Sequence, residues 1–274
     1  IQYAGSMETL LTYVGDGSNN VLPGSVVHDP IRNVTWIALK VFNSSTTYVT
    51  RVLKLTDGER TPTVVSDYDY YPATNKTLPS SMEVAPDGSL VMTVASFGSD
   101  GRTWVVIVRS TDEGATWKLV SEVSDSTRSP GANSGCRLSF LSRDFSTGTL
   151  FGVRTCFYDA ATTRTNRILY SVKSDWSGIE DRSTILSLGT TLTDTVHGPI
   201  VDSSGRLWLT SASPSAANIS GLQVYRFDSS GANATQVLHY FNNGFAGIFG
   251  FGMLHLGDAA GTWFAWGETA QTAN

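Results

Sequence analysis

Short runs of alternating apolar and polar residues, separated by tight polar turns, recur along the whole chain. The alternation is clear from Leu222 to Phe227 and from Ser89 to Thr93. A period of two residues is typical of strands that bury one face. No stretch of eleven residues carries the apolar spacing of an amphipathic helix. The pattern therefore predicts an all-β protein.

One unit repeats roughly every 50 residues, which is about the length of a four-stranded propeller blade. It consists of an apolar strand, a tight polar turn and a second apolar strand. Five segments carry it: Ser25–Val41, Met82–Ser96, Cys136–Tyr158, Gly198–Ser211 and Met253–Gly267. A second hairpin follows each of the first four, at Tyr48–Val65, Thr103–Val123, Arg167–Leu188 and Leu222–Phe241. Two hairpins per repeat predict blades of four strands.

The fifth repeat lacks a second hairpin at the C-terminus, but the N-terminal segment Glu8–Leu22 has the same strand–turn–strand pattern. We expect this segment to pair with Trp263–Glu268, so that the N- and C-terminal strands close the last blade and no sheet edge stays open. The predicted fold is a single domain, a five-bladed β-propeller. Its blades are expected at about 24–66, 80–124, 135–189, 197–241 and 251–274 plus 1–22. A two-sheet sandwich is the alternative, although it does not explain the doubled hairpins.

The segment from Ser110 to Trp117 reads Ser-Thr-Asp-Glu-Gly-Ala-Thr-Trp and matches the pattern Ser/Thr-x-Asp-x-Gly-x-Thr-Trp. In such a turn the Asp carboxylate accepts backbone N–H bonds, and the Gly supplies a positive φ. The segment resembles the Asp-box (BNR-repeat) β-propellers of the sialidase-like superfamily, in fold only. The resemblance implies a structural role on the outer part of a blade, away from any ligand. That role falls to Asp112, Gly114, Thr116 and Trp117.

The catalytic chemistry of sialidases does not carry over, because the Arg-Ile-Pro motif of that family is absent and six blades are typical there. Asp29-Pro30 is similar to the start of the furanosidase and arabinanase propellers, whose catalytic Asp lies near the start of an innermost strand. Here Asp29 aligns with the turn positions of Asp87 and Ser203. We therefore interpret Asp29 as a turn residue at a hairpin tip.

Ligands of propellers bind on the face where an outermost strand returns to the next innermost strand. The return segments here, 67–81, 124–135, 189–197 and 242–252, are the longest and most irregular of the chain. Aromatic rings and polar groups together can recognise sugars. On these segments and the strands beside them we expect a site formed by Tyr70, Tyr71, Glu83, Arg137, Asp194, His197 and Phe249. Two alternatives stay open: the tyrosines cover seams between blades, or Glu83 and Arg137 form an ordinary ion pair.

Charge and composition restrict the partners. The chain has 274 residues and a formal net charge of -5, from 19 Lys+Arg against 24 Asp+Glu, with no basic run. Nucleic acid is therefore not an expected partner, because binding it requires clustered cations. Apolar stretches such as Trp104–Val108 are long enough for a strand and not for a bilayer, so no membrane insertion is expected.

The only two cysteines, Cys136 and Cys156, bracket one hairpin whose turn centres midway between them. An antiparallel pairing would bring them face to face, so we predict a disulfide; two buried free thiols are the alternative. The four histidines lack metal-ligand spacing, and neither a metal nor a cofactor is expected.

These observations predict a carbohydrate-recognition or attachment module, such as a secreted lectin or the receptor-binding part of a phage or virus particle. Its partner would be a glycan or cell-surface receptor, its location extracellular, and no catalytic residue is assigned. A glycoside hydrolase or lyase acting through axial carboxylates is the first alternative, and a structural propeller that binds protein is the second. Carboxylates paired within about 10 Å on the axial face would favour the enzyme.

Overall fold

The computed structural model describes residues 21–44, 46–70, 76–97, 103–122, 135–157, 165–185, 195–202, 204–214, 219–231, 233–243, 245–255 and 262–270. Within these ranges the regular structure consists of β-strands, as the alternation predicted. No helix of the described residues has the length and apolar character required to cross a membrane.

Consecutive strands pair antiparallel in groups of four, and we number these groups as sheets one to four. Sheet one contains β1 (Val21–Asp29), β2 (Val34–Phe42), β3 (Tyr48–Thr56) and β4 (Thr63–Tyr68). Sheet two contains β5 (Thr77–Val84), β6 (Leu90–Phe97), β7 (Thr103–Ser110) and β8 (Lys118–Glu122). Sheet three contains β9 (Gly135–Arg143), β10 (Leu150–Phe157), β11 (Thr165–Val172) and β12 (Ile179–Ile185). Sheet four contains β13 (Thr195–Val201), β14 (Leu207–Pro214), β15 (Ile219–Phe227) and β16 (Ala234–Asn243).

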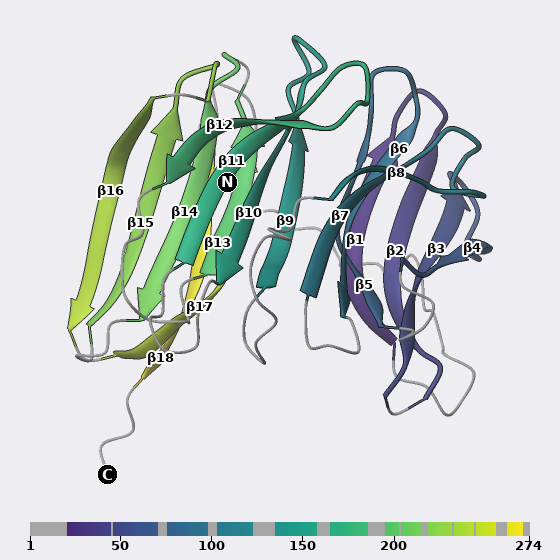
Figure 1. Ribbon diagram of the computed structural model, residues 1–274. Helices are drawn as coiled ribbons and strands as arrows, with labels where there is room; N and C mark the ends of the chain where they lie inside the picture. The colour runs from purple at the N-terminus through teal and green to yellow at the C-terminus, as the bar shows by residue number, and fades with distance from the viewer. Residues whose placement is uncertain are drawn as a thin grey trace.

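A last antiparallel pair, β17 (Phe245–His255) and β18 (Thr262–Ala270), follows sheet four. Sheets two and three are joined by one parallel residue pair, Thr103 with Gly135. The first strand of each sheet contacts the first strand of the next, in the order β1, β5, β9, β13 and β17. These first strands are therefore innermost, and Figure 1 shows the sheets placed side by side around them.

Each four-stranded sheet repeats the same irregularities, which marks the sheets as copies of one unit. The innermost strand has one residue more than its partner at Gly24, Ser80, Leu138 and in the pair Gly198-Pro199. The outermost strand has an extra residue at Val65, Val120, Arg182 and Val237. Such bulges strengthen strand twist, and stacked four-stranded sheets must be strongly twisted to pack radially.

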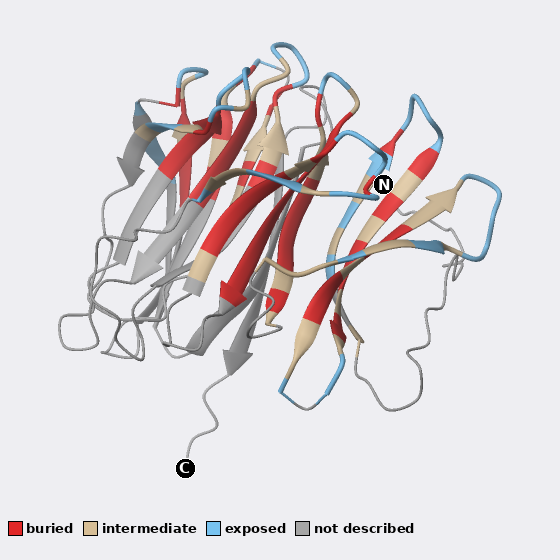
Figure 2. Ribbon diagram, turned by 45° about the vertical axis from the view of Figure 1, so that its right-hand side comes forward, coloured by how far each residue is buried: buried red, intermediate tan, exposed pale blue. Residues whose placement is uncertain are grey.

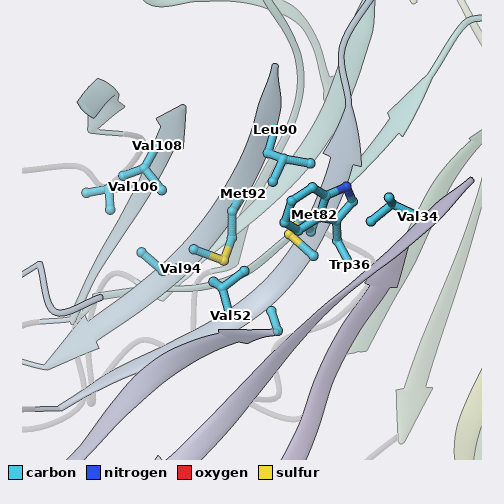
Figure 3. Packing of buried hydrophobic residues seen from close by; sticks show 10 residues of the cluster. Val34, Trp36, Val52, Met82, Leu90, Met92, Val94, Val106 and Val108 are labelled. Carbon is cyan, nitrogen blue, oxygen red and sulfur yellow. The ribbon is translucent and has the colours of Figure 1, made fainter. Parts of the chain in front are cut away.

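The core lies between neighbouring sheets, because the middle strands bury both of their faces. In β6, Leu90, Met92 and Val94 pack with Trp36 of sheet one, whereas Val91 and Ala95 pack towards sheet three. Figure 3 shows the first of these clusters and Figure 2 the buried band along the sheets. Burying such a side chain contributes about 1.5–3 kcal/mol. Double-sided burial explains why the run at 104–108 is continuously apolar instead of alternating.

Nine of the ten hairpins of the sequence pattern correspond to adjacent antiparallel strands. The fold is thus confirmed as all-β with four-stranded antiparallel sheets. The expected clasp lies outside the described residues, because Glu8–Leu22 falls almost wholly within 1–20. A fifth blade, its closure and the proposed blade limits therefore stay predictions.

Candidate functional site

Antiparallel order puts the connections of each sheet at two opposite ends. The turn face carries the tight hairpin turns between the first and second strands and between the third and fourth strands; it is edged by exposed residues in Figure 2. The return-loop face carries the links between sheets and the loops between second and third strands. The sequence placed the ligand on the return-loop face, so each expected residue is assigned below to one of these two faces.

Most of the expected ligand residues belong to the return-loop face. Tyr71 and Asp194 lie outside the described residues. Arg137, His197 and Phe249 lie in the innermost strands β9, β13 and β17, opposite residues Thr155, Thr210 and Gly267 of the neighbouring strands. All three fall in the half of their strand that is nearer this face. The backbone therefore places an Arg, a His and a Phe on three different innermost strands, each near the same end of the sheets.

Tyr70 is partly buried and packs against the apolar cluster between sheets one and two, together with Trp104. Its backbone N–H donates to Thr77 Oγ1 at 3.1 Å. Burial raises the pKa of the Tyr70 hydroxyl, and the negative charge of Glu122 raises it further. Tyr70 therefore covers the seam between sheets one and two.

Two carboxylates of the link that contains Tyr70 already have partners. Asp67 forms a two-pronged ion pair with Arg51, at 2.7 Å for each contact. Asp69 accepts the hydroxyl of Thr77, which in turn contacts Ser96. These bonds tie the link between β4 and β5 to the sheets, so the two acids have structural partners.

Glu83 occupies a different place from the one the sequence suggested. It is the penultimate residue of β5 and precedes the 85–89 turn, so it lies at the turn face and not beside the return loops. Its cationic neighbour is Arg143, the last residue of β9, whose Nη1 donates to Val84 O at 3.0 Å. Burial raises the pKa of Glu83 to about 7, although Arg143 opposes the rise. Sequence reasoning missed Arg143, because the contact depends on how two innermost strands end side by side.

A cavity of about 410 Å³ opens beside Glu83 and Arg143. Its other walls come from the end of β1, the following turn and the 85–89 turn. Two apolar side chains at its rim are strongly exposed, Ile31 at 92% and Phe145 at 81%. An apolar rim around a few polar groups is the usual composition of a small-molecule site.

A second cavity, of about 590 Å³, lies between sheets two and three on the same face. The half-buried ring of Trp176 lines this cavity. The backbone of Trp176 has a φ of 62°, which bulky residues rarely adopt. The Arg109 guanidinium lies 4.2 Å from the ring centroid. Because the ring also packs against the apolar cluster between sheets two and three, its position is accounted for by packing.

The first hairpin turns contain buried aspartates, and Asp29 is one of them. Asp29 is 2% exposed, accepts N–H bonds from Ile31 and Arg32 and forms an ion pair with Arg32 at 2.7 Å. Burial alone would raise its pKa, but the hydrogen bonds from Arg32 and Ile31 outweigh burial and lower the pKa. Asp29 ends β1, so it lies at a hairpin tip and not at the start of the innermost strand.

The turn from Ser110 to Trp117 forms the bonds expected of its sequence. Thr116 donates from its N–H and its hydroxyl to Asp112, and these bonds lower the pKa of Asp112 to about 2. Gly114 has a φ of +83°. The turn also contacts sheet one, because Ser66 Oγ donates to Gly114 O at 2.6 Å and accepts from Trp117 Nε1 at 3.2 Å. Its contacts thus link neighbouring sheets.

Strands β9 and β10 place Cys136 directly opposite Cys156, in the register that the hairpin predicted. The disulfide itself stays a prediction. Among the described residues, no group of three His, Cys, Asp or Glu side chains is arranged to hold a metal ion.

No known protein family matches the sequence, and no curated protein matches it either. Solved structures do resemble the fold. The α-L-arabinanase of Penicillium chrysogenum in complex with arabinobiose aligns with a TM-score of 0.57 and 15% identity, over 80% of this chain and 67% of that chain. The GH93 α-L-arabinofuranosidase of Fusarium graminearum with arabinobiose aligns at 0.55 and 16%, over 81% and 66%.

The Trypanosoma rangeli sialidase in complex with sialic acid aligns at 0.51 and 12% identity, over 90% of this chain and 44% of that chain. The chain thus spans about two thirds of the length of the two arabinose-related enzymes and under half of the sialidase. At these identities the likeness concerns the fold alone, and it is a likeness to β-propellers.

Proposed function

We propose that the protein is a carbohydrate-active propeller, a glycoside hydrolase whose substrate binds on the return-loop face. The observation that carries the proposal is the fold likeness to arabinose- and sialic-acid-processing propellers over 80% or more of the chain. This reverses the order of the two functions considered from the sequence, because attachment was placed first there and hydrolysis second.

Several residues are proposed to carry the reaction or recognition. Tyr70 and Tyr71 would stack on a sugar ring, and Arg137, His197 and Phe249 would approach it from the innermost strands. Most glycoside hydrolases use a pair of carboxyl groups. Asp67 and Asp69 are engaged in structural bonds, so we propose Asp194, in the link between sheets three and four, as one member of that pair.

The test is a hydrolysis assay with linear arabinan, sialyllactose and β-1,3-galactan, in which released monosaccharide is measured for the wild type and for Asp194→Asn. Asp181→Asn, on an exposed part of β12, serves as the matched control. We expect release from at least one substrate, a loss of 100-fold or more in Asp194→Asn, and no loss in the control. Release that is equal in both variants would refute the role of Asp194, and no release from any glycan would refute the enzyme.

Attachment without catalysis is the second function, favoured by the engagement of Asp67 and Asp69, two of the described acids near Tyr70. A glycan array distinguishes it: binding without hydrolysis, lost in Tyr70→Ala or Arg137→Ala, would support attachment. The phage, virus or secreted setting and the extracellular location remain part of this proposal. If the protein neither binds nor hydrolyses a glycan, the remaining proposal is a structural propeller that binds protein.

A further inference from the structure

The cavity beside Glu83 contains hydrogen-bonding groups that the protein does not use. Glu83 is partly buried, and among the described residues its carboxyl has neither a hydrogen bond nor an ion pair; the one charge that acts on it is that of Arg143. A buried polar group without a partner is destabilising, so such a group calls for an explanation.

Arg143, on the neighbouring innermost strand, also has unused capacity. Its Nη1 donates to Val84 O at 3.0 Å, but its Nε is buried without an acceptor. The guanidinium carbon lies 5.2 Å from the centroid of the Phe145 ring. An acid and a guanidinium from adjacent innermost strands thus line one cavity.

The other charges around the cavity are largely paired. Asp29 is bound to Arg32, and Asp87 to Arg109. His28 contacts the Thr35 hydroxyl at 3.1 Å. The charge of the cavity therefore depends on Glu83: with Glu83 protonated, the positive charge of Arg143 has no counter-ion among the described residues.

We infer that this cavity binds a small carboxylate, which accepts hydrogen bonds from the guanidinium of Arg143 and from the protonated carboxyl of Glu83. Charge-assisted bonds between Arg and carboxylate are among the strong ones in proteins. The body of the ligand packs on the exposed apolar rim formed by Ile31 and Phe145. The volume of about 410 Å³ suits a ligand of one or two rings.

This site is separate from the glycan site proposed above, because it lies on the turn face. Two chemical sources could supply the ligand, a sugar acid or an aromatic acid, since both join a carboxylate to a ring. A neutral sugar of the same size offers no charge to Arg143 and is not expected to bind.

The affinity depends on pH in a defined direction. Burial raises the pKa of Glu83 to about 7, so the proton donor is present at pH 6 and mostly lost at pH 8.5. Ionised Glu83 repels the ligand, whose own carboxylate stays ionised throughout this range. We therefore expect at least about tenfold weaker binding at pH 8.5 than at pH 6.

The experiment is isothermal titration calorimetry of the full chain with glucuronate, benzoate and glucose at both pH values. Glu83→Gln keeps a neutral hydrogen-bond donor, so we expect it to bind at both pH values without the pH dependence. Arg143→Met should lose binding, while Arg226→Met, the same change beside Trp208 in sheet four, should keep it. Phe145→Ala removes an exposed ring and should weaken binding without unfolding the protein, which covers the case in which Arg143→Met fails to fold.

Binding of glucuronate alone would identify a sugar acid, binding of benzoate alone an aromatic acid, and binding of both would show that the carboxylate dominates. The inference is overturned if neither acid binds, if glucose binds equally well, if folded Arg143→Met keeps wild-type affinity, if Phe145→Ala changes nothing, or if affinity does not fall towards pH 8.5. None of these outcomes depends on hydrolysis at the return-loop face.

Discussion

The buried aspartates of the turn face and the partly buried Glu83 beside them have pKa values that are shifted in opposite directions. Asp29, Asp144 and Asp202 are 2–4% exposed, yet their pKa values are lowered, because turn N–H groups and side-chain donors outweigh burial. Glu83 lies a short distance away without donors, and burial raises its pKa to about 7. The contrast has two causes: donors in the turns keep the aspartates ionised, whereas Glu83 is more strongly desolvated by the surrounding protein and has no such donor. The aspartates hold the turns, whereas Glu83 is left for another partner.

The largest expected effect comes from removing a satisfied acid. Asp202 accepts bonds from the N–H groups of Ser204 and Arg206, from Arg206 Nε and from Trp208 Nε1. Asp202→Ala leaves these donors unpaired, so we expect a loss of about 2–4 kcal/mol in the free energy of unfolding. Denaturant titration measures it. Asp202→Asn keeps one acceptor and should lose less; an Ala variant as stable as the wild type would contradict the account.

The second prediction concerns Glu83, whose contribution to stability falls with rising pH, opposite to that of the turn aspartates. The pKa of Glu83 is raised from 4.5 to about 7, so its protonated form is favoured by folding. Its contribution is fully present below pH 4.5 and is lost as the pH rises through 7, on the order of 2–3 kcal/mol. The wild type should therefore lose stability over this range relative to Glu83→Gln, as measured by denaturant titration at each pH. Parallel curves for the two proteins would show that Glu83 titrates normally.

A third comparison concerns two glycines with positive φ in turns. Gly148 has a φ of +77°, and a Cβ there would overlap the ring of Pro86 in sheet two. Gly58 has a φ of +86° and open space around it. Replacement by Ala should cost about 1 kcal/mol at Gly58, from backbone strain alone, and about 2 kcal/mol at Gly148. Equal losses of stability in the two variants, measured by thermal or denaturant unfolding, would mean that Pro86 can move to make room for the added methyl group.

The smallest effect is expected at the exposed Asp112. Its bonds to Thr116 close the turn, but water can replace them, so Asp112→Ala should lower the melting temperature less than Asp202→Ala does. Glycan binding should stay unchanged, since the turn lies opposite the return-loop face. A larger loss than at Asp202, or a loss of glycan signal, would refute this ranking.

The sequence was sufficient for the strands and their order because each hairpin carries its own signal. Alternation identified the half-buried strands, and turns such as Pro86-Asp87-Gly88 marked their ends. The five-blade count and the Glu8–Leu22 clasp stay predictions. They depend on contacts between the two chain ends, which a local sequence pattern does not encode. The bulges at Ser80 and Val120 were also invisible, since a one-residue insertion leaves the apolar pattern almost intact.

The candidate site was predicted only in part, for a related reason. The innermost positions of Arg137, His197 and Phe249 follow from strand order, and the turn role of Asp29 follows from its spacing. Glu83 was assigned to the wrong face, although the turn that follows it indicates the correct one. Its cationic neighbour Arg143 is 60 residues further along the chain, so only the packing of sheet two on sheet three reveals that the two side chains line one cavity.

The most direct test is the titration of Glu83 itself, followed by the carboxyl ¹³C resonance in NMR and assigned by its absence in Glu83→Gln. The account predicts a midpoint of about 7 in the ligand-free protein. A midpoint near the ordinary value of 4.5 would contradict it, because the carboxyl would then be solvated or bonded like the turn aspartates.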